Sequence, residues 1–229
     1  MNASNSELEQ IKSRYEKRKT DSDVIAHSGN FYFNHYAQAE RELEYLRILY
    51  KYFTDFENLK LLEIGAGGGG NLYFFQKNGF SNSNIFANEL LPDRLEILKH
   101  KFSGIHILSG DATQLDESEM PLFDIVFQST VFTSILDSAF KMKLAGKMWS
   151  LTKPGGMVLW YDFAFDNPSN KDVKGIKKME IRKLFPEAQK INFHKVTLAP
   201  PIGRKVKNLY PIFNLFPFLR THLIAEIIK

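Results

Sequence analysis

A run of glycines between a short apolar segment and a helix-like one is the feature that most constrains how this chain folds. The apolar residues 59–64 are followed at once by Gly65-Ala66-Gly67-Gly68-Gly69-Gly70. Glycines there permit a tight strand-to-helix turn and let a ligand approach the backbone closely. The pattern therefore predicts a ligand site at the end of a first buried strand, with a purely structural turn as the alternative.

The rest of the chain alternates short apolar runs with amphipathic segments. Continuous apolar runs suit a parallel sheet covered on both faces, and five are predicted as strands: residues 59–64, 84–88, 105–108, 124–128 and 157–162. Helices are predicted at residues 6–18, 37–53, 71–78, 92–102, 137–151 and 173–185. Two tail strands, 191–198 and 222–228, lack a full crossover helix between them and are expected to pair antiparallel. The alternation predicts a doubly wound α/β fold with a mostly parallel, seven-stranded sheet.

The length and composition of the chain suit one compact domain. With 229 residues, 44% of them hydrophobic and 24% charged, the chain is average for globular proteins. It contains 0 cysteines, which excludes disulfides and thiolate sites. We find neither a signal-type apolar segment nor about 18 uninterrupted apolar residues, so a cytoplasmic location is expected. We expect residues 1–56 to form an N-terminal helical lid and residues 57–229 the ligand-binding domain.

Three acidic residues at the ends of the first three predicted strands favour one kind of cofactor. Glu63 lies two residues before Gly65, Glu89 ends the second strand, and Asp111 follows the third. All three should meet at the carboxyl edge of the sheet, where open α/β sheets bind ligands. A carboxylate at position 63 attracts the cationic methionine end of S-adenosylmethionine and repels the pyrophosphate of a dinucleotide. Glu89 suits the ribose hydroxyls of either cofactor, and Asp111 suits the adenine amino group.

With these motifs, residues 61–156 resemble class I S-adenosylmethionine-dependent methyltransferases. The resemblance also includes Phe-Asp-Ile-Val at 123–126 and Leu-Thr-Lys-Pro-Gly-Gly at 151–156. It implies S-adenosylmethionine as cofactor and a closing hairpin whose last strand lies antiparallel beside the fifth. The implied cofactor contacts are Glu63, Gly65, Ala66, Gly67, Gly69, Glu89, Leu90, Asp111, Ala112 and Gln128. From the N-terminal lid, Tyr15 and Tyr32 are expected to join them.

Candidates for the acceptor side follow strands four and five or lie in the tail. Asp162 is the best-placed carboxylate for a base, Gln128 is the second catalytic candidate, and a structural role is the alternative. The predicted substrate contacts are Trp160, Tyr161, His194 and His222. The segments Trp160-Tyr161-Asp162, Leu198-Ala199-Pro200-Pro201 and Leu219-Arg220-Thr221-His222 are similar to those of bacterial small-molecule and glycan methyltransferases. This resemblance implies methyl transfer to an oxygen of a small molecule, with a saccharide or sugar phosphate favoured.

Other kinds of site lack their sequence signals. Asp162 and Asp166 have no histidine near them in the sequence, so no metal site is predicted. The net charge of +4 is spread along the chain, and the fourth strand does not end in an Asn/Asp-Pro-Pro-aromatic run. We therefore expect no nucleic-acid partner. An NAD-dependent oxidoreductase, a non-catalytic S-adenosylmethionine-binding protein and an RNA methyltransferase stay open as alternatives.

The segment 200–219 is predicted to be a loop that combines basic and aromatic residues. Arg204, Lys205 and Lys207 precede an apolar run that includes Phe213 and Phe216. Such a segment suits weak peripheral contact with the inner face of a membrane. The wall of an acceptor pocket and packing within the fold or between subunits are the alternatives. The sequence does not indicate an oligomeric state.

Overall fold

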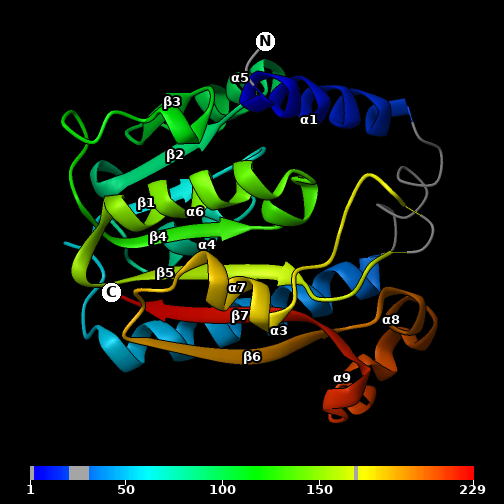
Figure 1. Cartoon of the computed structure of the whole chain (residues 1–229). Coiled ribbons are helices and arrows are strands. Elements are labelled where there is room, and N and C mark those ends of the chain that lie inside the picture. The colour runs from blue at the N-terminus through cyan, green and yellow to red at the C-terminus, as the bar shows by residue number, and fades with distance from the viewer. Residues whose placement is uncertain (1–2, 21–30, 168–169) are drawn as a thin grey trace.

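In the computed structural model, which describes residues 3–20, 31–167 and 170–229, the chain forms one seven-stranded sheet (Figure 1). The strand order is β3-β2-β1-β4-β5-β7-β6. Strands β1 to β5 run parallel, and β7 lies antiparallel between β5 and β6. The predicted fold class is confirmed, including the antiparallel strand beside the fifth. The strands are β1 Leu61–Ile64, β2 Ile85–Glu89, β3 His106–Ser109, β4 Phe123–Ser129, β5 Thr152–Phe163, β6 Lys190–Leu198 and β7 Arg220–Ile228.

Helices cover both faces of the sheet because its central strands have apolar side chains on both sides. In β1, Leu62 and Ile64 join the core under α6 and α7, whereas Leu61 joins the core under α3 and α4. In Figure 1, α6 and α7 lie in front of the sheet and α3 lies behind it. This two-sided burial explains the continuous apolar runs. The helices are α1 Ala3–Thr20, α3 Phe31–Tyr52, α4 Leu72–Lys77, α5 Pro92–Lys101, α6 Ser138–Leu151 and α7 Lys178–Leu184.

The helix expected at 173–185 begins later than predicted. The amides of Lys174 and Ile176 donate to the carbonyls of Thr133 and Phe163. These bonds hold the chain against neighbouring segments, so a helix forms only from Lys178 onward.

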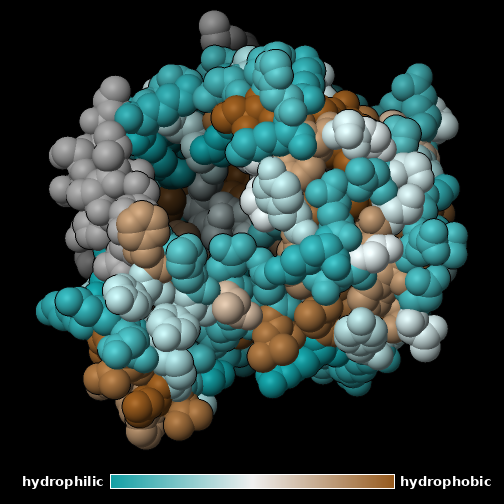
Figure 2. Space-filling model, turned by 180° about the vertical axis from the view of Figure 1, so that it is seen from behind, coloured by the Kyte–Doolittle hydropathy of each residue, from teal (hydrophilic) through white to brown (hydrophobic). Residues whose placement is uncertain are grey.

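The segment 200–219 is largely helical rather than a loop. It contains α8 Pro200–Val206 and α9 Tyr210–Phe213, with 3-10 turns between and after them. Large apolar side chains are exposed here, as the brown projection at the lower left of Figure 2 shows. They are Leu209, Ile212, Leu215, Phe216 and Phe218. Membrane contact through this surface stays a prediction. Among the described residues, none of the helices has the length and apolar character of a membrane span.

Helix α3 is fixed to the tail hairpin by an ion pair and by hydrogen bonds. Lys51 Nζ lies 2.8 Å from Oε1 of Glu226 on β7, whose side chain is only 1% exposed. Nearer the start of the helix, the Glu40 carboxylate accepts the Thr197 amide at 2.9 Å and the Tyr210 hydroxyl at 2.8 Å. These contacts set where α3 crosses the carboxyl edge of the sheet.

We expect Lys51→Met to destabilise the fold because it leaves the buried Glu226 without its cation. Burial raises the pKa of Glu226, but its bonds to Lys51 and Asn192 outweigh this and hold the pKa below its usual value. Urea unfolding should show a loss of about 1–3 kcal/mol, the range for a buried acceptor that loses a charged partner. Arg47→Met, four residues away in an exposed ion pair with Glu44, is the control and should cost less than about 1 kcal/mol. Equal losses in both variants would contradict the anchoring role.

Candidate functional site

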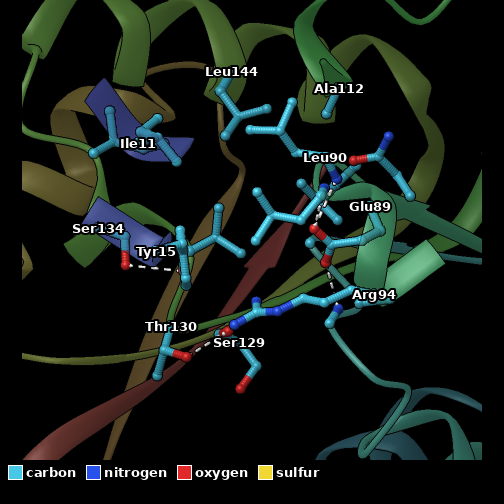
Figure 3. A pocket seen from close by; sticks show the side chains of 18 of the residues that line it. Ile11, Tyr15, Glu89, Leu90, Arg94, Ala112, Ser129, Thr130, Ser134 and Leu144 are labelled. Atoms are coloured by element: carbon cyan, nitrogen blue, oxygen red, sulfur yellow. Dashed lines mark hydrogen bonds between the residues drawn. The ribbon is translucent and has the colours of Figure 1, made fainter. Parts of the chain in front are cut away.

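A cavity of about 410 Å³ opens at the carboxyl edge of the sheet, between α1, the glycine turn and the ends of β2, β3 and β4. Cavities of this size hold small molecules. A hollow is visible at this edge in Figure 2, and Figure 3 shows the wall from close by. The sequence-predicted cofactor contacts that line it are Tyr15, Gly65, Ala66, Gly67, Glu89, Leu90, Asp111 and Ala112.

The turn after β1 needs glycine where its backbone is left-handed. Gly65 and Gly67 have φ of +66° and +60°, which L side chains rarely adopt. A Cβ at Gly65 would also lie 2.6 Å from Cγ2 of Val131. At Gly69 a Cβ would overlap the ring of Phe102, so this glycine permits α5 to pack closely against the turn. Gly69 does not border the cavity, and its role as a cofactor contact stays a prediction.

Backbone amides orient the Glu89 carboxylate at the end of β2. Oε2 accepts the Gly67 amide at 2.7 Å, and Oε1 accepts the amides of Leu90 and Leu91 at 2.8 Å each. A carboxylate offers about four acceptor positions, so Glu89 keeps capacity for a ligand hydroxyl. The bond to Gly67 also joins the end of β2 to the glycine turn.

Asp111 lies at the next strand end, where it caps a 3-10 turn. Its Oδ1 accepts the Thr113 amide at 2.9 Å and its Oδ2 accepts the Thr113 hydroxyl at 2.7 Å. Beside it, Asn88 donates to the carbonyl of Gly110 at 3.0 Å. Both side chains border the cavity, so Asp111 combines the capping role with the predicted position at the ligand site.

Glu63 is buried behind the cavity wall and does not line it. Its side chain is fully buried, Oε1 accepts a bond from Asn71 Nδ2 at 2.7 Å, and Oε2 has no hydrogen-bond partner. Burial raises the pKa of Glu63 to about 8, so its carboxyl is largely protonated at neutral pH in this ligand-free state. Asn71 borders the cavity in its place. The contact of Glu63 with the cofactor stays a prediction, and Asn71 lies between this carboxyl and the cavity.

The cavity has an apolar end and a polar end. At the apolar end, side chains from α1, α6 and the turns after β2 and β3 form a slot; they are Leu8, Ile11, Leu90, Ala112, Phe140 and Leu144. The polar end is bordered by Gln38, Arg41, Asn71, Ser129 and Thr130. Figure 3 shows Leu144 and Ala112 on one side and Ser129 and Thr130 on the other. A flat aromatic base suits the first end, and charged groups suit the second.

Helix α1 borders one side of the cavity with Leu8, Ile11 and Tyr15, and the lid role of residues 1–56 stays a prediction. Tyr15 lies between the guanidinium groups of Arg18 and Arg94, which are 4.7 and 4.5 Å from its ring centroid. Its hydroxyl donates to Ser134 Oγ at 3.2 Å. Helix α3 packs into the core of the sheet and also borders the cavity with Gln38 and Arg41. Tyr32 on α3 is 55% exposed and does not border the cavity, so its contact with the cofactor stays a prediction.

The predicted catalytic residues Asp162 and Gln128 are buried outside the cavity wall. Asp162 is 1% exposed, and its Oδ1 accepts the Thr133 hydroxyl at 2.5 Å. Gln128 accepts the Val131 amide at 3.0 Å and donates to the Tyr161 carbonyl at 3.2 Å. Burial raises the pKa of Asp162 to about 7. Both side chains tie β4 and β5 to the turn after β4, and their catalytic and cofactor-binding roles stay predictions.

The alternation of side chains along β5 places the other predicted acceptor residues. Trp160 points into the core on the α6 side, where it packs against Phe132. Tyr161 points to the α3 side, is 2% exposed, and stacks on His222 with ring centroids 5.3 Å apart. His194 bridges carboxylates of α3 and β7. None of these four residues borders the cavity. They have packing and anchoring contacts instead, and their contact with substrate stays a prediction.

The sequence analysis missed Gln38, Arg41 and Asn71 at the polar end of the cavity. Asn71 directly follows the glycine run, which was a usable signal. Arg41 lies on the helix predicted at residues 37–53, which was recognised from its apolar face alone. Thr130, at the same end of the cavity, has φ of +58°, which is unusual for a β-branched residue. No local sequence pattern predicts this backbone conformation. Within the described residues, no cluster of three or more His, Cys, Asp or Glu side chains is placed to hold a metal.

Comparison with known proteins gives one family and many structures of the same fold. Residues 62–160 match the family described as methyltransferase domain. The 1,6-didemethyltoxoflavin-N1-methyltransferase of Burkholderia thailandensis, solved with S-adenosylhomocysteine, is 14% identical with a TM-score of 0.66 and covers 100% of this chain and 91% of its own. The N-methyltransferase NodS of Bradyrhizobium japonicum, also with S-adenosylhomocysteine, is 14% identical with a TM-score of 0.67, covering 96% and 98%. No curated protein matches the sequence.

We expect Glu63→Gln to remove a pH-dependent penalty on stability. A glutamate in the unfolded chain ionises near pH 4.5, whereas Glu63 in the fold ionises near 8. Between these values the folded state binds more protons than the unfolded state, so stability falls as pH rises. The penalty is on the order of 3 kcal/mol between pH 5 and 8.

Urea unfolding of the ligand-free protein at pH 5, 6, 7 and 8 measures this fall. The Glu63→Gln variant should lose less stability than wild type over the series, while the exposed control Glu57→Gln should follow wild type. Parallel curves for Glu63→Gln and wild type would show that Glu63 is ionised in the fold at neutral pH.

Proposed function

We propose that this protein transfers a methyl group from S-adenosylmethionine to a small molecule, since residues 62–160 match the family described as methyltransferase domain. The observation that carries the proposal is the two-ended cavity, with an apolar slot at one end, Glu89 at its wall and polar groups at the other end. The cofactor and the acceptor would share this cavity at the carboxyl edge of the sheet.

The residues present fit S-adenosylmethionine. The apolar slot formed by Leu90, Ala112 and Phe140 suits the adenine ring, and Glu89 has an acceptor position left for a ribose hydroxyl. The unpartnered Oε2 of Glu63 lies behind Asn71, and a cationic ligand group beside it would favour the ionised form of this carboxyl. When bound, the cofactor supplies a methyl group activated by a sulfonium. The protein then has to align the acceptor with that methyl group and to exclude water.

The acceptor we propose needs no base from the protein. In the described part of the cavity wall, the acidic side chains are Glu89 and Asp111, and both are engaged by backbone amides. A neutral hydroxyl would benefit from a base, whereas an anionic oxygen or a neutral amine attacks without one. Within the expected class of oxygen acceptors, a sugar phosphate therefore suits the cavity better than a neutral saccharide. The N-methyltransferases among the similar structures make an amine the second candidate.

We expect S-adenosylhomocysteine to stabilise the protein in a thermal-shift measurement and NAD to leave it unchanged. Ligand at about 100 times its dissociation constant should add roughly 2.7 kcal/mol. Glu89→Ala should weaken S-adenosylhomocysteine binding about tenfold or more, because it removes the proposed ribose acceptor and frees the Gly67 amide. Glu96→Ala, an exposed glutamate on α5 paired with Lys99, is the control. Stabilisation by NAD alone would overturn the proposal.

We expect Asp162→Asn to lower stability without abolishing methyl transfer. Asp162 accepts bonds from Thr133 and Gln128, and an amide cannot accept all of them with both of its atoms. The loss should be about 1–3 kcal/mol in urea unfolding. Transfer of tritiated methyl groups to a panel of sugar phosphates, carboxylates, amines and RNA should continue at a rate near that of wild type per folded molecule. A transfer rate that falls about a hundredfold or more in a folded variant would restore Asp162 as the base. An absence of transfer by wild type to every compound, with S-adenosylhomocysteine bound, would favour a non-catalytic binding protein.

A further inference from the structure

Arg41 brings a positive charge to the polar end of the cavity. It lies in α3 and borders the cavity together with Gln38, Ser129 and Thr130. Its guanidinium carbon is 4.7 Å from the ring centroid of Tyr161, so the planar group stacks over that ring. Its Nε is buried and has no hydrogen-bond partner.

No side chain of the described residues neutralises this charge at ion-pair distance. Within 4.0 Å of its guanidinium nitrogens we find no carboxylate oxygen among the described residues. The neighbouring Glu40 is occupied by the Thr197 amide and the Tyr210 hydroxyl. Burial, together with the charge of Arg41, lowers the pKa of His222 to about 3, so the imidazole is neutral beside the guanidinium. Arg41 therefore contacts Tyr161 but has no carboxylate partner among the described residues, and its charge is available to an anionic ligand at the cavity.

The surroundings hold Arg41 so that its free edge is available to a ligand. Tyr161 is fixed from below by stacking on His222 and by a 3.2 Å hydrogen bond between its hydroxyl and Thr197 Oγ1. On the cavity side, Thr130 keeps a left-handed backbone with φ of +58° at the end of β4. Strained residues of this kind concentrate at ligand sites. A guanidinium held on an aromatic ring matches the planar geometry of carboxylates and phosphates.

We propose that Arg41 binds an anionic group of the methyl acceptor, a carboxylate or a phosphate. The proposal rests on the function proposed above and narrows it, because it makes the acceptor an anion. The cofactor also has a carboxylate, and this group is the alternative anion that Arg41 could bind.

The first experiment observes the Nε–H resonance of Arg41 by ¹⁵N NMR in protein loaded with S-adenosylhomocysteine. Arg41→Gln identifies the resonance by its disappearance, and Arg41→Lys does so if the glutamine variant does not fold. Titration with acetate and with inorganic phosphate should shift this resonance to saturation, and tetramethylammonium chloride should not. Arg47→Gln, on the exposed side of α3, should leave the titration unchanged. A resonance that neither anion moves would overturn the proposal.

The second experiment separates the two sources of a carboxylate. Dissociation constants of S-adenosylhomocysteine and of 5′-methylthioadenosine, which lacks the amino-acid part, are measured for wild type and for the Arg41 variants. We expect both dissociation constants of the Arg41 variants to stay within about threefold of the wild-type values. A loss of about 1.4 kcal/mol in binding would instead change them tenfold. A loss of about tenfold or more for S-adenosylhomocysteine alone would assign Arg41 to the cofactor and overturn the proposal. If wild type binds neither nucleoside, the proposed function itself fails; if it binds them and the anions do nothing, only this inference fails.

Discussion

At the carboxyl edge of the sheet, the Glu89 carboxylate accepts the Gly67 amide with one oxygen and the amides of Leu90 and Leu91 with the other. One carboxylate therefore joins the ends of two neighbouring strands, because β1 and β2 run parallel and end at the same edge of the sheet. The turn can approach that closely only because its backbone is left-handed at Gly65 and Gly67. This arrangement sets the shape of the cavity beside Glu89, at its apolar end. It also sets the direction in which Glu89 can accept a further hydrogen bond.

The other end of the cavity is built by parts of the chain that lie far from the glycine turn. Helix α3 carries Arg41, and its place is set by the bonds of Glu40 to Thr197 and Tyr210 and of Lys51 to Glu226. The tail hairpin therefore positions the side chains of α3 at the polar end of the cavity, while β1 to β3 position those at the apolar end. This division is consistent with a fold that keeps one cofactor and serves many acceptors. A change in the tail hairpin would therefore act on the polar end of the cavity rather than on its apolar end.

The sequence predicted those parts of the molecule that depend on local pattern and strand order. Buried strands follow from apolar runs, and residues directly after strand ends, such as Glu89, Leu90 and Asp111, do lie at the cavity. The burial of Asp162 could not be predicted, because adjacent residues of a strand point to opposite faces and no local signal indicates which residues of β5 meet the cavity. Arg41 was missed because its position depends on tertiary contacts of a helix outside the motif. The burial of Glu63 depends likewise on Asn71 and the surrounding core.

The chemistry of the cavity limits what Arg41 can do for an acceptor. A guanidinium bonded to the attacking oxygen would hold the lone pairs that must form the new bond, and would make that oxygen a weaker nucleophile. Arg41 therefore suits a part of the acceptor that does not react, at a distance from the attacking atom. An acceptor that satisfies both this restriction and the lack of an available base in the described cavity wall has two functional groups. One is an anionic anchor for Arg41, and the other is an atom that attacks without losing a proton to the protein.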